Sequence, residues 1–460
     1  MIRDGRFRWA AGIVFCLLAA ALLTGWKHYA DTARQRALAQ QDERTRWLEQ
    51  GQKNPHLAAH YGVYAFKPEL PLSALDQGLN AYLGVAVWLE AHKQNLFKFR
   101  PAEDATAAAR FGELTAAATL QMLIPLLIIL LLHAAFTGER EQGTLRLLAS
   151  LGVPARKLAY GKVLGAVAVL ATLLIPAAVI GAVAMMLFSG TASAAAAWSR
   201  ALVMTISYLL YFGVFIGAAL IVSARVKSSQ LALILLLAGW FANSFVVPRV
   251  MTDLAGKLRP ISSALDVATA IEHDLEQGLD GHGNQGARVA ELKARTLSQY
   301  GVKSVEELPV NFSGIQLNAA DEYGYQVYDK HLNTVFAAWE GQNRMVQLAA
   351  VAAPLLSVQA LSMGLSGTDF AQHRDFTDKA ENYRRGIQKQ MSNALTVGSQ
   401  TGAYVVAGNE LWQRVAPFEY QSPGLGWVLA HYRWSLALLL GWFAAVWLAL
   451  PAIVTRLKPE

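Results

Sequence analysis

Long apolar stretches dominate the pattern of hydrophobic and polar positions along the chain. Roughly 20 apolar residues are enough to cross a bilayer as a helix, and six stretches qualify: residues 9–26, 117–136, 163–188, 200–223, 230–248 and 433–454. The first is longer than the ~7–15 apolar residues of a signal peptide and ends at Trp26 and Lys27, a poor cleavage site, so we expect an uncleaved anchor. We therefore predict an integral membrane protein with six spans.

Composition and charge agree with this prediction and exclude several other classes. Of the 460 residues, 54% are hydrophobic and only 16% are charged, whereas a soluble chain has about a quarter charged residues. The formal net charge of +7 is explained by basic residues that set the orientation of a membrane protein. No nucleic-acid partner is therefore expected. The single cysteine, Cys16, excludes an intramolecular disulfide and a cysteine-based metal site.

Basic residues orient the predicted spans, because short cytoplasmic loops are rich in Lys and Arg. They precede the first span, separate spans two and three and spans four and five, and follow the sixth: Arg3, Arg6, Arg8, Arg140, Arg146, Arg156, Lys157, Lys162, Arg225, Lys227, Arg456 and Lys458. Both termini are then cytoplasmic. Residues 27–116 and 249–432 form two extracytoplasmic insertions, which carry most of the water-exposed mass.

A seventh apolar stretch, residues 345–365, is also long enough to span. It contains Gln347, Pro354 and Gln359, and a full crossing would move the basic C-terminal tail outside. Polar or irregular elements at membrane depth survive only when protein covers them. We therefore predict a packed or re-entrant helix here.

The two insertions are predicted to form one mostly helical unit, which makes the fold class all-α. Helices are expected over 31–50 and over 72–95, where Leu75, Leu79 and Leu83 follow a helical spacing. In the second insertion, helices are expected near 262–278, 285–300, 320–350 and 368–397. Strand signals are scarce. We expect the chain to divide into three membrane segments, 1–26, 117–248 and 433–460, and the two extracytoplasmic insertions between them, 27–116 and 249–432.

The spans offer no energy source of their own. No Asp, Glu, Lys, Arg or His lies within 163–188, 201–222, 230–247 or 434–450, which disfavours a proton-driven carrier. The chain also has no Gly-x-x-x-x-Gly-Lys-Ser/Thr loop to hold nucleotide phosphates. Any active transport must therefore be driven by another polypeptide, and this chain is not expected to be an enzyme.

The cytoplasmic loop between spans two and three has the pattern of a short amphipathic helix over 138–152. Glu139 and Glu141 lie where a helix N-terminus favours negative charge, and Gly152 with Pro154 ends the helix. One apolar stripe runs along it: Leu145, Leu148 and Leu151. Periodicity alone fits an interfacial anchor and a docking element equally well.

The same loop carries a family resemblance. Glu139-Arg140-Glu141-Gln142-Gly143-Thr144-Leu145, followed by Pro154 and Gly161-Lys162, resembles the coupling-helix signature of ABC-2 type permeases, and the six-span layout is similar too. Residues 56–95, 300–317 and 361–385 resemble the DUF3526 subgroup, relatives of the membrane subunit of the nitrous-oxide reductase maturation transporter.

The resemblance implies a permease subunit of the bacterial inner membrane with a periplasmic domain. It would pair with itself or with a sister permease, amid membrane lipid, and with two cytoplasmic ATP-binding subunits that hold ATP and Mg. This chain would hold no cofactor. The resemblance assigns ATPase coupling to Glu139, Glu141, Gly143, Thr144, Leu145 and Leu148. Two alternatives remain: a membrane-anchored protein that binds a periplasmic partner, and a passive carrier.

Three further polar features could carry a functional role. Asn243 is the strongly polar side chain deep in a span, and it either bonds across helices, which we favour, or lines a translocation path. His56 and His60 have a spacing that suits zinc, but without an intervening acid we interpret them as polar residues of the outer domain and predict no metal or catalytic site. The charges between Asp369 and Arg385 are predicted to form a salt-bridged, solvated helix face.

Overall fold

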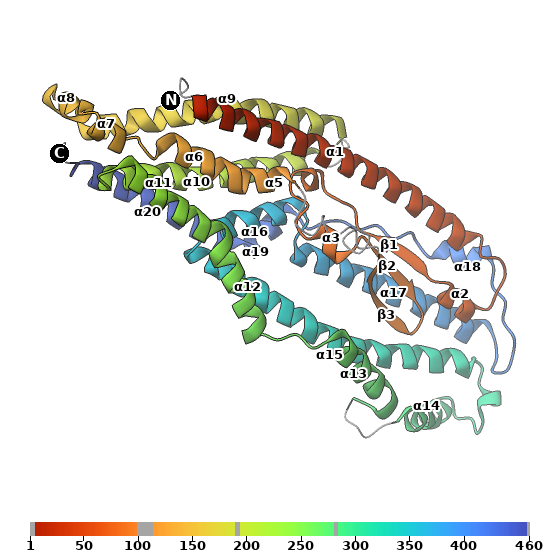
Figure 1. Cartoon of the computed structure of the whole chain (residues 1–460). Coiled ribbons are helices and arrows are strands. Elements are labelled where there is room, and N and C mark those ends of the chain that lie inside the picture. The colour runs from red at the N-terminus through yellow and green to blue at the C-terminus, as the bar shows by residue number, and fades with distance from the viewer. Residues whose placement is uncertain (1–4, 99–113, 189–193, 280–283, 458–460) are drawn as a thin grey trace.

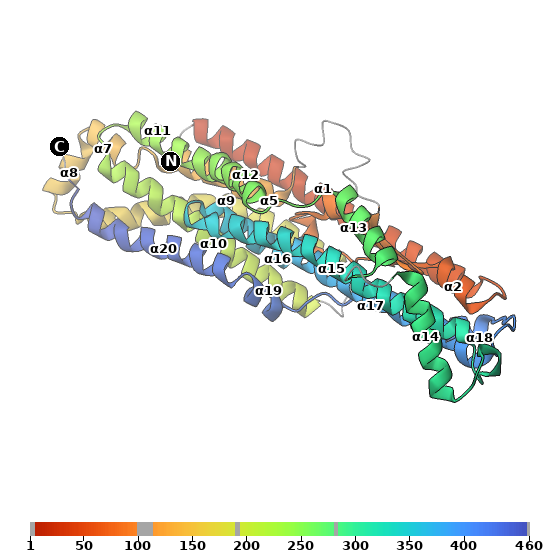
Figure 2. The same ribbon diagram turned by 90° about the horizontal axis from the view of Figure 1, so that it is seen from below.

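The computed structural model describes residues 5–98, 114–188, 194–279 and 284–457 and is elongated (Figures 1 and 2). Within them, six helical segments are long and apolar enough to cross a membrane, which confirms the predicted number. They are α1 (Gly5–Leu48), α5 and α6 (Ala116–Ala118, Ile124–Leu132) joined by a π-helical turn, α9 (Ala155–Phe188), α10 (Ala194–Arg225), α11 and α12 (Ser229–Phe241, Val247–Leu258), and α20 (Arg433–Val454). Both termini lie at one end (Figure 1).

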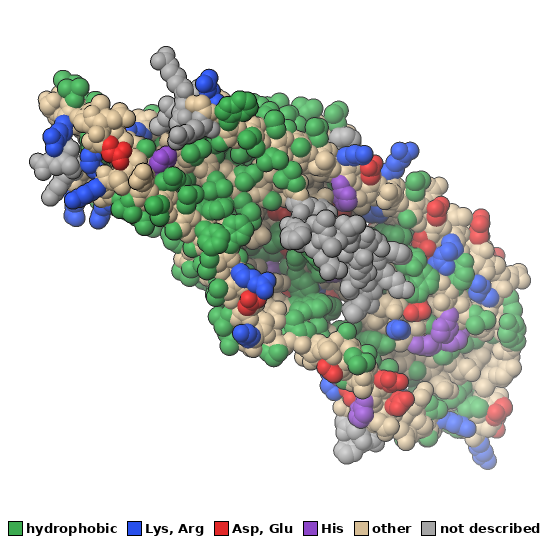
Figure 3. All heavy atoms as spheres, viewed as in Figure 1, with side chains coloured by type: hydrophobic (Ala, Val, Ile, Leu, Met, Phe, Trp, Pro, Cys, Tyr) green, Lys and Arg blue, Asp and Glu red, His purple; other side chains and the backbone are tan. Residues whose placement is uncertain are grey.

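The remaining mass forms what we call the distal unit, residues 27–98 and 259–432 within the described ranges. Hydrophobic side chains cover the spans, whereas charged ones gather over the distal unit and at the terminal end (Figure 3). The predicted helix over 31–50 is the second half of α1, whose 44 residues extend for about 66 Å. This exceeds the ~30 Å of a hydrocarbon core. Helix α1 therefore runs from the spans into the distal unit, where Trp47 is buried.

A small antiparallel sheet corrects the all-α prediction. Strands β1 (Val63–Phe66), β2 (Ala86–Glu90) and β3 (Lys93–Lys98) pair in that order. The helix expected over 72–95 is wrong, because only a 3-10 turn (Pro71–Ala74) and α3 (Asn80–Leu83) are helical there. Gly84, at φ +78°, ends α3, and the β-branched and aromatic residues that follow favour a strand.

The second insertion contains the four expected helices: α13 (Ala264–Gln277), α14 (Gln285–Tyr300), α15 (Phe312–Leu348) and α17 (Phe370–Gly398). Helix α15 begins earlier than expected because Asn311 caps it, accepting a 2.9 Å hydrogen bond from the Ser313 amide. The short helices α2 (Pro55–Tyr61), α18 (Asn409–Arg414) and α19 (Leu425–His431) complete the unit. A shared core, with Trp47, Leu89, Phe376 and Trp412 among its members, joins both insertions.

The seventh apolar stretch is interrupted. Helix α15 ends at Leu348, a 3-10 turn follows, and α16 (Pro354–Ser366) begins after Ala353. Thirteen residues give a helix of about 20 Å, which is short of the ~30 Å needed to cross. Helix α16 packs against α10 and α20 (Figure 2) and is buried along most of its length. It is a covered helix beside the spans.

Candidate functional site

A bent helix pair stands at the end of the molecule that carries both termini (Figure 1). Instead of the single helix predicted over 138–152, the structure has α7 (Thr137–Glu141) and α8 (Thr144–Ser150). The break is at Gly143, which adopts φ +73°. A Cβ placed on Gly143 would touch nothing within 4 Å. Glycine is therefore required here by the left-handed backbone and not by a close neighbour.

Helix α7 is tied to the spans by ionic hydrogen bonds. The Glu141 carboxylate accepts from the Ser229 amide (2.6 Å) and hydroxyl (2.9 Å) at the start of α11. Glu139 accepts from Lys162 of α9 at 2.6 Å. The Arg140 guanidinium donates to two backbone carbonyls at the C-terminal end of α10, at 2.6 and 3.2 Å. A displacement of α7 would therefore pull on α9, α10 and α11.

The predicted leucine stripe divides into a buried and an exposed part. Leu145 is buried at 2% exposed, and Leu148 is half-buried. Thr144 donates its hydroxyl to the Glu139 carbonyl, which braces the bend. Leu147 and Leu151, by contrast, are 60% and 70% exposed. Leu147 was missed as a candidate, although its i, i+4 spacing to Leu151 was visible in the sequence.

Asn243 lies in a π-helical turn between α11 and α12 and is buried. Its side-chain amide donates to the Tyr211 hydroxyl of α10 at 3.2 Å. Its carbonyl oxygen accepts from the Leu355 amide, at the start of α16, at 3.1 Å. Both polar atoms of Asn243 are thus engaged in joining α10 and α16, the interhelical role that we favoured from the sequence.

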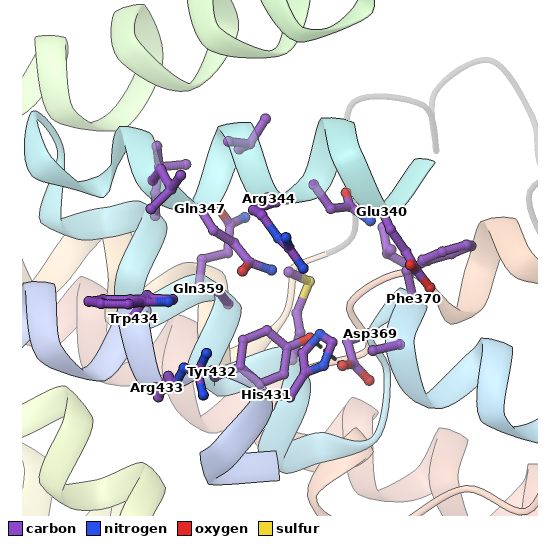
Figure 4. Close-up of a pocket in the computed structure, with 18 of the residues that line it drawn as sticks. Glu340, Arg344, Gln347, Gln359, Asp369, Phe370, His431, Tyr432, Arg433 and Trp434 are labelled. Carbon is purple, nitrogen blue, oxygen red and sulfur yellow. Dashed lines mark hydrogen bonds between the residues drawn. The ribbon is translucent and has the colours of Figure 1, made fainter. Parts of the chain in front are cut away.

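A cavity of 420 Å³ opens where the spans meet the distal unit. It lies between α15, α16, the start of α17 and the junction of α19 with α20. Arg344 and His431 extend into it from opposite walls (Figure 4). Its other polar lining includes Glu340, Gln347, Gln359, Asp369, Tyr432 and Arg433. We call it the junction cavity. Its mixture of both charges, amides and an imidazole can bind a solute that carries polar groups.

A buried carboxylate lines one wall of the junction cavity. Asp369, 2% exposed, accepts hydrogen bonds from the Tyr432 hydroxyl and from the Gln372 side-chain amide, the latter at 3.0 Å. Burial raises the pKa of the Asp369 carboxyl, and the Tyr432 bond opposes this. Lys67 is near enough to interact with Asp369 electrostatically, and burial lowers the pKa of its ammonium.

The turn before Asp369 connects the spans to both insertions. Arg200, on α10, donates to the Leu365 carbonyl at 3.1 Å and to that of Pro423. Lys67 donates to the Gly367 carbonyl at 3.0 Å. The Leu79 amide bonds to the Thr368 carbonyl at 2.8 Å. Helix α7 contacts the C-terminal end of α10. The N-terminal end of α10 therefore holds the turn that forms one wall of the junction cavity.

The charges of α17 form salt bridges, as predicted, but two of them are buried and not solvated, which corrects the other half of the prediction. Glu381 and Arg384 are 6% and 1% exposed, and they pair at 2.7 Å. Arg385 bonds to Glu381 at 2.8 Å and to Asp329 of α15 at 2.6 Å. The face is buried because β2 covers it: Arg384 also donates to the Glu90 carbonyl at 3.1 Å. Because the sheet was not predicted, the burial of these charges was not expected.

Sequence comparison finds a family model that matches part of the chain. The model described as "Domain of unknown function (DUF3526)" matches residues 264–421, from the start of α13 to beyond α18. This is 158 of the 460 residues, and it contains much of the junction cavity but neither α7 nor α8. The chain thus carries a DUF3526 domain. No curated protein matches the sequence.

Proposed function

We propose that this chain is the permease subunit of an ABC-2 type transporter in the bacterial inner membrane. An ATP-binding subunit, present in two copies, would dock on α8 from the cytoplasm and hydrolyse ATP with Mg. The chain itself would hold no nucleotide and would not be an enzyme. Both termini would be cytoplasmic, and the distal unit would lie in the periplasm.

The observation that carries this proposal is the pair of exposed leucines, Leu147 and Leu151, on a helix pair braced against three spans. Two large apolar side chains at the tip of a charged end cost free energy unless they are covered. A docked protein would cover them, and the bonds of Glu139, Arg140 and Glu141 would pass its motion into α9, α10 and α11.

Helix α10 provides the route for that motion. Its 32 residues extend for about 48 Å. Arg140 bonds to its C-terminal end, and Arg200, near its N-terminal end, holds the turn beside Asp369. A shift of α10 would alter the junction cavity, which we assign as the site where a polar solute is recognised. The apolar path between two permeases would then need no charged residue at the midplane.

The second permease is expected against the lateral face of α1, α9 and α10. A cleft of 360 Å³ with mostly apolar walls lies there, lined among others by Leu22, Gly181, Met185 and Met204. Small residues such as Gly181 permit close approach of another helix. Lipid acyl chains are the other occupants that this chemistry suits.

The docking proposal is tested with the chain and its ATP-binding subunit co-expressed and reconstituted in vesicles. The double change Leu147→Asp and Leu151→Asp should abolish co-purification of the ATP-binding subunit and ATP turnover, because it charges the docking surface. Leu265→Asp, at a 75% exposed leucine of α13, is the matched control and should leave both unchanged. Equal co-purification of both variants would overturn the docking assignment. A stable chain with no ATP-binding partner would favour a membrane-anchored periplasmic interaction protein or a passive carrier.

A further inference from the structure

Three histidines from two elements meet on the surface of the distal unit. His56 and His60 lie on α2, and His92 lies in the turn between β2 and β3. One ring nitrogen from each lies within 4.8 Å of the others. The Nε2 atoms of His56 and His60 are 3.2 Å apart. Histidine side chains gather on this face in Figure 3. The sequence showed only the pair, because the sheet that brings His92 to it was not predicted.

The backbone presents these rings in defined positions. Asn54 caps α2 by accepting a 2.9 Å hydrogen bond from the His56 amide. The i, i+4 spacing then places His56 and His60 on one helix face. His92 has φ +60°, the one positive value among the described non-glycine residues. This left-handed conformation is unfavourable for a residue with a Cβ. Such strain persists where the surrounding structure enforces it, and it concentrates at functional sites.

A buried carboxylate stands behind His92. Asp321 of α15 is 4% exposed, and its Oδ1 lies 2.7 Å from His92 Nδ1. A carboxylate in this position accepts a hydrogen bond from Nδ1–H, so the proton of the neutral ring stays on Nδ1 and the free lone pair is on Nε2. Histidines that bind metals show this arrangement, in which an outer carboxylate fixes the tautomer and makes the ligand nitrogen more basic.

We propose that His56, His60 and His92 bind one divalent transition-metal ion of the zinc class, with Asp321 as the outer-shell partner of His92. Two nitrogens bound to tetrahedral zinc at 2.0–2.1 Å lie about 3.3 Å apart, close to the separation of the His56 and His60 Nε2 atoms. Imidazole nitrogens suit zinc and its neighbours in the first transition row, whereas magnesium and calcium require oxygen ligands.

The site is open on one side. His60 and His92 are exposed and His56 is partly buried, so an ion can enter from solvent. Three protein ligands leave a fourth position for water or for a group from another molecule. Since Asp321 belongs to α15, the bound ion would also link the first insertion to the second. This assignment does not depend on the proposed transporter function.

The test is a titration with Zn²⁺ alone. The full chain, purified in detergent with a tag that contains no histidine and freed of metal by a chelator, is titrated in a calorimeter. We expect one tight site per chain. His92→Ala should weaken binding by more than the 10–100-fold that is typical for loss of an outer-shell partner, and Asp321→Asn should weaken it within about that range. His273→Ala is the matched control, with a side chain that is 65% exposed, and it should bind like wild type.

Folding is monitored separately by thermal unfolding without metal. Zn²⁺ should raise the melting temperature of the wild type and leave that of His60→Gln, a conservative change at an exposed ligand, nearly unchanged. Co²⁺ offers a second readout, since a four-coordinate site gives intense visible absorption. The proposal is overturned if the wild type binds no Zn²⁺, or if a folded variant lacking all three histidines binds it equally well. In either case, the three histidines interact only through the His56–His60 hydrogen bond and their ring contacts.

Discussion

Tyr432 donates its phenolic hydroxyl to the Asp369 carboxylate, and this bond crosses from the start of span α20 to the start of α17. Both side chains are buried, at 3% and 2% exposed. Close packing fixes the position of the ring, because a Cβ on Gly364 would lie 2.3 Å from Tyr432 Cε2. The bond is therefore part of the covered joint between the spans and the distal unit.

Replacing Tyr432 with phenylalanine should destabilise this joint. The change removes the hydrogen-bond donor of Tyr432 from a buried Asp369 oxygen. We expect this to lower the free energy of unfolding by about 1–3 kcal/mol. We expect a lower melting temperature in detergent. Tyr404→Phe is the control, since Tyr404 is 77% exposed and its loss of a hydroxyl should have no effect. Equal melting of the two variants would mean that the Tyr432 bond contributes nothing net.

The orientation of the chain is tested by labelling single cysteines in a Cys16→Ala background. Ser150, at the end of α8, and Ser298, on α14, are both exposed and lie at opposite ends of the molecule. In intact spheroplasts, an impermeant thiol reagent should label Ser298→Cys and spare Ser150→Cys, because basic loops remain in the cytoplasm. The reverse labelling pattern would invert the proposed topology.

The sequence predicted the spans well because their signal is local: about 20 apolar residues in one helix satisfy their own backbone. The sheet was missed because its evidence is not local. Val63 pairs with Leu89 across an intervening segment, and leucines with a helical spacing occupy that segment. The leucine stripe of α8 was predicted only in part: Leu145 is buried, whereas Leu151 is exposed together with Leu147, which was not in the stripe.

The histidine site shows the same limit. His56 and His60 are visible as a pair in the sequence, but His92 and Asp321 join them only through the β2–β3 turn and the packing of α15. The junction cavity likewise combines α15, α16 and α17 with residues of the last span. Sites assembled from distant segments therefore required the fold, whereas the loop that we propose for docking is continuous, and its motif is visible in the sequence.

The contact between α10 and α20 depends on glycine, as expected for small residues in spans. A Cβ on Gly217 would lie 2.2 Å from Val446 Cγ1. Gly217→Leu should force the helices apart and destabilise the protein by about 1–3 kcal/mol, the typical effect of overpacking. Gly239→Leu is the matched control in span α11, because nothing lies within 4 Å of its Cβ position. If both variants melt alike, the close packing of α10 on α20 does not limit stability.

The contact of α13 with α15 should depend on pH through Asp274. Its carboxylate accepts from Lys330 at 2.7 Å and from His331 at 2.8 Å. The Lys330 hydrogen bond is the main cause that lowers the pKa of Asp274 to about 2, against 3.8 for the free side chain.

A pKa that is lower in the folded state means that ionised Asp274 stabilises the contact above about pH 4, and that this stabilisation is lost as the pH falls toward 2. Asp274→Asn should therefore speed hydrogen exchange in α13 at pH 6, and the ratio of variant to wild-type exchange should approach one by pH 2. Taking the ratio removes the intrinsic dependence of exchange on pH. Asp253→Asn, at an exposed ion pair with Arg249, is the control and should change little at any pH. A ratio for Asp274→Asn that stays constant from pH 6 to pH 2 would show that its ionisation does not hold α13 in place.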